Sequence, residues 1–357
     1  MSNTSSSNPI PDKQKAWRAV KRGTPAEAIR FDKDAPVPSK LKQGEVLVKV
    51  QAAALNPVDY KLLGMLPNLI ANRPYPMAND IAGVVVASAD SKFAVGDEVF
   101  GTVWLQAQRK EQQGALAEYV RIAATSIAKR PKDIKPTEAA GISMVAVTAS
   151  VGLFQHGNLQ PGQNVFISGG STAVGLAAIQ FAKAIGCKVT VTGSGPKEEM
   201  LRTLGADEFM DYTKGPVYDR LIENPPSPKF DIIFDTVGSV DPKLFSLSEA
   251  YLAPDGTFLS VGPQPEGSGK LGQLANFFWT VSRPTWVCGG VNRKLCIFST
   301  SESPEELARV VKFLEEKKFK PAVDSVYSFD QVVEAYNHLM TKRATGKVVI
   351  KVDPDVQ

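Results

Sequence analysis

The stretch at residues 164–186, NVFISGGSTAVGLAAIQFAKAIG, decides the fold of this 357-residue chain. A hydrophobic strand runs into a glycine turn, and an apolar helix follows at once. Glycine lacks a Cβ, so it permits the sharp turn and lets the backbone approach a phosphate, while the helix N-terminus offers free N–H groups and a positive dipole end. The turn, with Gly169, Gly170 and Gly175 as its glycines, therefore predicts a pyrophosphate site.

The match to the usual dinucleotide fingerprint is imperfect, because Thr172 and Ala173 stand where glycines are common. The order of strand, turn, helix and second strand supports the interpretation. We expect a cofactor to be held by Gly170, Ser171, Thr172, Ala173 and Val174. A glycine-rich turn without a ligand is the alternative.

From about residue 137, strands alternate with helices of about ten or more residues, a texture that predicts right-handed βαβ crossovers and a parallel sheet. The expected strands are NVFIS, KVTVTG, FDIIFDT, GTFLSVG and KLCIFST. The expected helices are Ala173–Ile185, Lys197–Leu204, Pro242–Leu252 and Pro304–Glu316. Residues 137–316 are thus predicted to form a doubly wound α/β domain of the Rossmann type.

Residues 16–120 have a different texture, with short alternating strands separated by Pro and Gly. We predict a β-rich domain over residues 14–136. It is completed by residues 317–357, where a helix over Phe329–Leu339 and the strand KVVIKV return to it. Residues 1–13 are polar and are expected to form a disordered tail.

Composition narrows the class of partner. With 41 basic and 37 acidic residues, the net charge of +4 is too small to suggest nucleic acid or an acidic membrane surface. The 3 cysteines have no CxxC spacing, which argues against a disulfide framework and favours a reducing, cytoplasmic location. The longest uncharged run, residues 139–155, is shorter than a bilayer span. We therefore expect a small-molecule partner.

The end of the second expected strand predicts which nicotinamide cofactor binds. NAD enzymes place an acidic residue there for the ribose 2′-OH, whereas this chain has Ser194, Gly195, Pro196 and Lys197. A hydroxyl and an ammonium suit a 2′-phosphate, so NADPH is favoured over NADH. Lys197 is alternatively a solvated residue in the first turn of a helix. Tyr212 either flanks the same phosphate or belongs to the core.

Seven segments carry a resemblance that runs from about residue 16 to 352. They are NPVDYK (56–61), DIAGVV (80–85), VGDEVFG (95–101), GALAEYV (114–120), LGADEFMDY (204–212), FDIIFDTVG (230–238) and TGKVVI (345–350). Together they resemble the quinone-oxidoreductase-like branch of the medium-chain dehydrogenase/reductase superfamily. The GGSTA turn is similar to that of fungal stand-alone enoyl reductases, which serve polyketide synthases. The resemblance implies a GroES-like catalytic domain beside a Rossmann domain, and a reductase whose substrate stays open.

The resemblance also implies that no catalytic zinc binds. Zinc-dependent relatives use a Cys after the third strand and a His-Glu pair before the AGxV segment, where this chain has Asn56–Asp59 and Asn79-Asp80. No cysteine precedes Cys187, and His156 and His338 are the only histidines, so a His/Cys zinc site cannot be assembled in the first domain. We interpret both histidines as structural, with His156 as a proton donor the alternative.

Metal-free hydride transfer from NADPH needs a donor to the substrate carbonyl oxygen and a proton for the α-carbon. In the family, the NPxDxK segment lies against the nicotinamide and its ribose. Lys61 and Tyr60 are therefore the catalytic candidates, with Val58 beside the cofactor and with Asn56 and Asp59 fixing the loop. Asn-Pro followed by Asp is also a turn signal in any protein, so a purely structural role stays open.

Further cofactor contacts are implied by the same resemblance. Thr148 occupies a helix that faces the nicotinamide, and its hydroxyl is a candidate for contact with the carboxamide or the substrate. The remaining implied cofactor contacts are Val261, Gly262, Lys347 and Val348. Water is an alternative proton source.

An apolar substrate pocket is expected from the loops around Leu62–Leu69, Val103–Leu105 and Phe277–Val287. The aromatic segment LANFFWTVSRPTW (274–286) forms either this pocket, ordinary core or a dimer contact. Three functions stay open: a reductase of activated C=C bonds, including carrier-bound acyl chains; a quinone reductase; and a non-catalytic nucleotide-binding protein. The chain is expected to be a monomer or a homodimer.

Overall fold

The computed structural model describes residues 10–265, 269–283 and 290–356. The chain divides into two compact units, one formed by residues 1–144, 302–308 and 321–357 and the other by residues 145–301 and 309–320. Residues 137–144 group with the first unit because helix α5, Pro136–Ala139, packs on strands of that unit. Residues 1–9 of the expected tail lie outside the described residues, and Lys13 already begins the first strand.

The second unit contains a six-stranded sheet in which all neighbouring strands are parallel. Its strands, in the order in which they lie side by side, are β11 (Glu208–Asp211), β10 (Lys188–Gly193), β9 (Asn164–Ser168), β12 (Phe230–Asp235), β13 (Leu252–Ser260) and β14 (Lys294–Ile297). The strand order reverses between β9 and β12, which makes this the point where a doubly wound sheet binds dinucleotides. The expected Rossmann architecture is confirmed.

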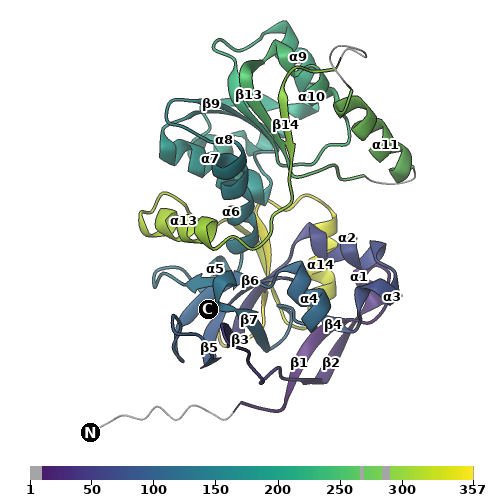
Figure 1. The fold of residues 1–357 in the computed structure, drawn as a ribbon, viewed down its shortest axis with the longest axis vertical. Helices are drawn as coiled ribbons and strands as arrows, with labels where there is room; N and C mark the ends of the chain where they lie inside the picture. Colours follow the sequence, from purple (N-terminus) through teal and green to yellow (C-terminus); the bar gives the residue numbers. More distant parts are fainter. Residues whose placement is uncertain (1–9, 266–268, 284–289, 357) are drawn as a thin grey trace. The chain divides into compact units, whose positions relative to one another are not determined.

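Helices connect these strands (Figure 1). They are α7 (Ala173–Ile185), α8 (Glu198–Thr203), α9 (Val217–Glu223), α10 (Lys243–Ser246) and α11 (Lys270–Val281), and the later part of α13 (Pro304–Glu315) follows the last strand. Before β9, α6 (Ser143–Ser150) continues into a π-helical turn, Val151–His156. Helix α7 is apolar on its packed face and ends at Gly186, whose φ of 88° suits a residue without a Cβ.

The expected single helix over Pro242–Leu252 is wrong. Helix α10 is only four residues long, and a 3₁₀ turn over Ser248–Ala250 follows it. Strand β13 begins at Leu252, which pairs with Phe230 in the parallel ladder. The chain must therefore leave the helix early to enter the sheet in register, a constraint that local propensity does not contain.

The first unit is built on two sheets. One is three-stranded, in the order β2 (Ile29–Pro36), β1 (Lys13–Ala19), β4 (Tyr75–Pro76). The other is seven-stranded, with β15 (Val323–Ser328), β16 (Lys347–Lys351), β3 (Glu45–Ala54), β5 (Asp80–Ser88), β6 (Glu98–Thr102) and β8 (Ile127–Lys129) in that order, while β7 (Tyr119–Ala123) pairs with β3. The expected β-rich GroES-like fold is confirmed, with β16 inserted beside β3.

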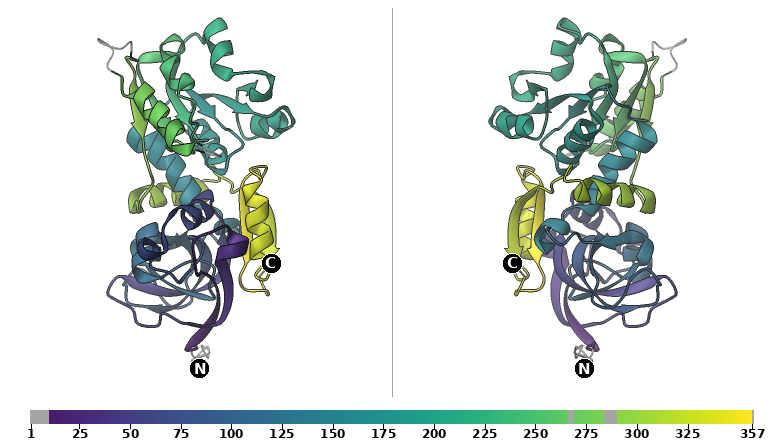
Figure 2. Two further views of the ribbon diagram at one scale, coloured as in Figure 1. Left: turned by 90° about the vertical axis from the view of Figure 1, so that its right-hand side faces the viewer. Right: turned by 90° about the vertical axis from the view of Figure 1, so that its left-hand side faces the viewer.

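Short helices complete the first unit. They are α1 (Pro25–Ala28), α2 (Pro57–Met65), α3 (Asn68–Ala71), α4 (Leu105–Glu111) and α14 (Val332–Met340). Helix α14 packs against β16, as both views of Figure 2 show in yellow. Its buried residues Val332, Ala335, Tyr336 and Leu339 recur at the spacing of one helical face.

The regions expected to be pocket loops are largely helical. Leu62–Leu69 contains the end of α2 and the start of α3, and Leu105 begins α4. The first eight residues of the aromatic segment belong to α11, in which Phe277 is buried and Trp279 is exposed. Residues 284–286 of that segment, and the end of the expected Phe277–Val287 loop, lie outside the described residues.

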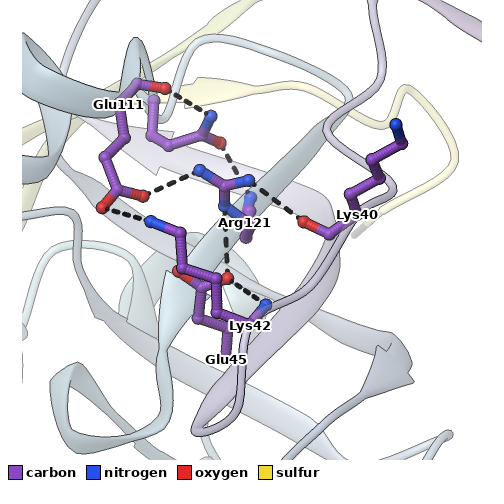
Figure 3. A network of polar contacts seen from close by, with 6 residues as sticks. Lys40, Lys42, Glu45, Glu111 and Arg121 are labelled. Carbon is purple, nitrogen blue, oxygen red and sulfur yellow. Dashed lines mark hydrogen bonds and ion pairs between the residues drawn. The ribbon is translucent and has the colours of Figure 1, made fainter.

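A surface network around Arg121 ties β3, β7 and α4 together (Figure 3). The Arg121 guanidinium lies 2.7 Å from Glu111 and 3.4 Å from Glu45, and it donates to the carbonyl oxygen of Lys40. Lys42 lies 3.0 Å from the same Glu111 carboxylate. The network fixes the C-terminal end of α4 to the sheet.

None of the helices in the described ranges combines the length and the hydrophobicity that a membrane-spanning helix needs.

Candidate active site

The glycine turn between β9 and α7 has the shape of a phosphate cradle. Gly169 has a φ of +82°, a conformation that side chains disfavour. A Cβ on Gly175 would lie 2.2 Å from the carbonyl oxygen of Gly169, so only glycine lets the helix approach the turn this closely. Helix α7 is 13 residues long, and the first-turn N–H groups at Ala173 and Val174 have no acceptor within the helix. The turn therefore fits a pyrophosphate.

The segment after β10 contains the residues that are expected to bind the adenosine half of the cofactor. Ser194 precedes a 3₁₀ turn over Gly195–Lys197, and Glu198, the next residue, is paired with Arg202 at 2.9 Å. Tyr212 is 54% exposed at the end of β11, so it does not belong to the core.

One acidic residue at this end was missed from the sequence. The Asp211 carboxylate lies 2.9 Å from where a Cβ on Gly195 would stand, because β11 pairs in register with β10. Hydrogen bonds from the Thr213 hydroxyl and backbone hold the pKa of Asp211 below its usual value. The carboxylate is thus ionised, and it caps the 3₁₀ turn after β11 by accepting from Thr213, close to the expected adenosine site.

The ends of β12 and β13 carry the next polar groups. Val261 and Gly262 follow β13, and Gly262 has a φ of +89°. Beside them, the buried Asp235 carboxylate accepts from the backbone N–H groups of Val237, Gly238 and Ser239. Burial raises the pKa of Asp235. Asp235 shapes the loop after β12 and was not singled out from the sequence.

A buried polar cluster lies at the ends of β3, β5, β6 and β16 in the first unit. We call it the Lys347 cluster; it consists of Lys347, Asp80, Asn56 and Thr102. The Lys347 ammonium lies 2.5 Å from Asn56 Oδ1 and 2.9 Å from Asp80 Oδ2, and only 3% of Lys347 is exposed. Asp80 also accepts from Asn56 Nδ2 at 2.9 Å and from Thr102 Oγ1 at 2.6 Å. The cluster is thus a buried Lys347–Asp80 ion pair whose charged groups also form hydrogen bonds with Asn56 and Thr102.

Asn56 and Asp80 of the Lys347 cluster stand at two of the positions where the sequence resemblance places the ligands of zinc-dependent relatives. Asn79, beside it, donates from its amide to the carbonyl oxygen of Val103. Among the residues that the structure describes, no three His, Cys, Asp or Glu side chains come together as a possible metal site. His338 bonds Asp324 at 2.7 Å, and His156 packs against Phe298 with ring centroids 4.9 Å apart.

The NPVDYK segment begins helix α2, so its Asn-Pro-Asp signal marks the start of a helix. Pro57 stands at the first helical position, and the Asn56 N–H donates to Asp59 Oδ2 at 2.8 Å. This is the carboxylate half of a capping box, a start signal that the sequence contained. Asn56 and Asp59 are both buried and fix the start of α2.

The side chains expected to reach the nicotinamide differ in their burial and in their hydrogen-bond partners. Val58, Tyr60 and Lys61 are half-buried on α2. In the second unit, Thr148 accepts a hydrogen bond from Thr300 at 2.8 Å. Val348 is fully buried, and its carbonyl accepts from the Leu55 N–H. The cofactor contacts of these residues stay predictions.

Asp59 is an unusual carboxyl group because it is buried without a full set of partners. Its Oδ2 also accepts from the Tyr336 hydroxyl at 3.3 Å, while its buried Oδ1 has no hydrogen-bond partner among the described residues. Burial raises the pKa of Asp59 to about 7, against the opposing effects of the Asn56 N–H and the Lys347 charge.

We expect this carboxyl group to make stability fall as the pH rises. The folded pKa is above the unfolded value of 3.8, so the folded chain holds the proton more tightly and loses that advantage as the pH approaches 7. Asp59→Asn keeps an acceptor for Asn56 and a neutral side chain. Relative to the parent, it should therefore gain about 2 kcal/mol of unfolding free energy between about pH 5.5 and about pH 8. Urea unfolding at both pH values measures this, and an unchanged difference between the two proteins would contradict it.

Known proteins and protein families are similar to this chain over nearly its whole length. Residues 42–132 match the alcohol dehydrogenase GroES-like domain, and residues 204–350 match a domain described as zinc-binding dehydrogenase. A trans-enoyl reductase of Aspergillus terreus is 32% identical, with 96% of this chain and 98% of the relative covered. An NADPH-dependent alkenal/one oxidoreductase of Arabidopsis thaliana, named chloroplastic, is 32% identical over 96% of this chain and 80% of its own length. Because this relative is named chloroplastic, the cytoplasmic location of the present chain stays a prediction.

A solved structure gives the same result at the level of the fold. The quinone oxidoreductase of Coxiella burnetii superposes with a TM-score of 0.76 at 25% identity, covering 95% of this chain and 99% of that one. Such coverage includes both units of the chain. The chain is therefore an oxidoreductase that uses a nicotinamide dinucleotide, and it belongs to the zinc-free, quinone-oxidoreductase-like and enoyl reductase branch of the medium-chain dehydrogenase/reductase superfamily.

Proposed function

We propose that this chain is an NADPH-dependent, metal-independent reductase that transfers hydride to a C=C bond conjugated with a carbonyl group, in an enone or an enoyl thioester. The observation that carries the proposal is the pair of relatives named for these reactions, each 32% identical over 96% of the chain. A small-molecule substrate fits this chemistry, including an acyl chain on a carrier.

NADPH supplies the hydride when it is bound, and the protein supplies binding, orientation and charge. The N–H groups at the start of α7 hold the pyrophosphate, and Ser194 and Lys197 bind the 2′-phosphate. Lys61 holds the ribose hydroxyls and stabilises negative charge on the substrate oxygen. Thr148 contacts the carboxamide or substrate, and Tyr60 or water gives the proton to the α-carbon.

The Lys347 cluster supports the metal-independent part of the proposal. Its cation is an ammonium group, which bonds both Asn56 Oδ1 and Asp80 Oδ2. A zinc ion placed among these groups would meet a like charge and an acceptor set already in use, without the His or Cys ligands that zinc prefers. The Lys347 ammonium is thus the positive charge that balances the Asp80 carboxylate.

Quinone reduction is the second candidate, favoured by the similarity to the Coxiella burnetii enzyme. A panel of enones, enoyl thioesters and quinones, scored by NADPH consumption in the presence of a chelator, separates the two. We expect the conjugated C=C substrates to be reduced with the largest kcat/KM, and the chelator to leave the rates unchanged. Faster turnover of quinones alone would replace the first candidate by the second. NADPH binding without consumption on any of them would favour a non-catalytic role.

NADPH should bind at least about tenfold more tightly than NADH, a difference of about 1.4 kcal/mol. Lys197 supplies a positive charge just after β10, where the chain also has the Ser194 hydroxyl. Lys197→Ala should therefore weaken NADPH and leave NADH unaffected, as measured by nucleotide fluorescence titration. Lys188→Ala is the matched control, because Lys188 stands at the opposite end of β10 from the Lys197 turn and is paired with Glu208 at 2.5 Å. Equal affinities for the two nucleotides would mean that the negative charge of the nearby Asp211 cancels the attraction of Lys197 for the 2′-phosphate.

A further inference from the structure

Two threonine hydroxyl groups meet beside the glycine turn. Thr172 is the N-cap of α7, and its Oγ1 accepts from the Gly175 N–H at 2.9 Å. Thr236 follows β12, the strand next to β9, and its Oγ1 lies 2.9 Å from Thr172 Oγ1. Thr236 is buried, with 7% exposed, so this contact is shielded from solvent.

Counting protons gives the contact a direction. The Thr236 hydroxyl lies 2.8 Å from the Ser168 carbonyl oxygen and 3.0 Å from that of Gly169, and carbonyl oxygens only accept. The single Thr236 proton therefore goes to one of these carbonyls. The Thr172 hydroxyl must then donate to Thr236 Oγ1, while its own oxygen accepts from Gly175.

This direction matters because an N-cap oxygen accepts from either the second or the third N–H of its helix. In α7 these are the N–H groups of Val174 and Gly175. Thr172 bonds the Gly175 N–H. The N–H of Val174 is then left for a ligand, at the helix terminus that suits an anion.

We propose that Thr236 is a positioning residue for the cofactor: by accepting the Thr172 proton, it commits Thr172 to the N–H of Gly175 and keeps the N–H of Val174 available for the pyrophosphate. Without Thr236, the Thr172 side chain is free to rotate and to cap Val174, in competition with the cofactor. The proposal rests on the proposed NADPH function of this turn.

The fold itself does not depend on the Thr236 hydroxyl. The Ser168 carbonyl also accepts from the Thr236 N–H, and the Gly169 carbonyl also accepts from the Thr172 N–H. Both carbonyls keep a partner in Thr236→Val. On the other side of the turn, Thr192 holds the N–H groups of Gly169 and Gly170, so the turn stays anchored to β10.

The test compares Thr236→Val with Thr236→Ser in the full-length chain. We expect the valine variant to raise the Kd for NADPH about three- to tenfold, with kcat at saturating NADPH and the melting temperature near those of the parent. Serine keeps the hydroxyl and should restore the parent affinity. Thr257→Val, at a buried threonine of β13, is the matched control and should leave the Kd unchanged.

A second ligand shows whether the loss of affinity arises at the pyrophosphate site. Adenosine 2′-monophosphate lacks the pyrophosphate, so its inhibition constant should be the same in Thr236→Val and the parent. Thr172→Val combined with Thr236→Val should be no worse than the poorer single variant, because both act on one hydrogen-bond chain. If Thr236→Val does not fold, Thr236→Ala serves in its place, because it removes the same hydroxyl with a smaller side chain.

Two outcomes would overturn the inference and one would overturn its premise. An unchanged NADPH affinity in Thr236→Val, or an equal loss for adenosine 2′-monophosphate, shows that Thr236 does not position the pyrophosphate site. If the parent protein binds no NADPH, the proposed function itself is refuted. This outcome requires only a binding measurement on the parent protein.

Discussion

Lys347→Met is expected to lower the free energy of unfolding by about 3–5 kcal/mol, because it leaves the Asp80 carboxylate buried without its cation. Asp80 is fully buried, and the Lys347 ammonium lies 2.9 Å from its Oδ2. Asn56 would also lose the partner of its Oδ1. Water cannot replace either bond at so buried a position without repacking. Urea unfolding of the parent and the variant measures the loss.

Two further variants show whether the loss comes from a charge left alone. Lys347→Met combined with Asp80→Asn removes both charges and should recover part of the stability. Lys188→Met breaks the Lys188–Glu208 pair, whose side chains are each 53% exposed, and should cost less than about 1 kcal/mol. If Lys347→Met costs no more than Lys188→Met, the Lys347 cluster does not stabilise the first unit as an ion pair.

Lys61→Ala should lower turnover of a conjugated substrate by roughly ten- to a hundredfold. A charge-assisted hydrogen bond to a ribose hydroxyl or a developing enolate contributes about 1.5–3 kcal/mol, which sets this range. Lys61 is half-buried on α2, whereas Asp59 and Leu63 form the buried face of that helix. The melting temperature should therefore change little. Steady-state kinetics with NADPH and an enone measure the effect.

Tyr60→Phe separates the two candidates on α2. If the Tyr60 hydroxyl donates the proton, its removal slows turnover and leaves the NADPH affinity intact. A ring that only packs would tolerate the change, since Tyr60 lies against the core of the first unit. Lys110→Ala, at an exposed lysine of α4, is the control for general loss of positive charge. Parent rates in both α2 variants would leave Thr148 or water as the leading candidate.

The sequence by itself determined the architecture of the second unit. The glycine turn, the helix after it and the alternation of strands and helices are local patterns, since each depends on backbone conformation or on one apolar face. The helix Ala173–Ile185 was predicted with its observed bounds. The start of α2 is equally local, because the Asn-Pro-Asp signal that predicts a turn also contains the capping box of this helix.

Tertiary structure decided the polar partners of the site. Asn56 and Lys347 are 291 residues apart in the chain, and Asp80 and Lys347 are 267 apart. They meet because β3 lies between β5 and β16, with Ala54 paired to Asp80 on one side and to Val349 on the other. Thr236 reaches Thr172 in the same way, through the pairing of β9 with β12. A hydrogen bond or buried ion pair of this kind depends on strand order and register, which no single stretch of sequence contains.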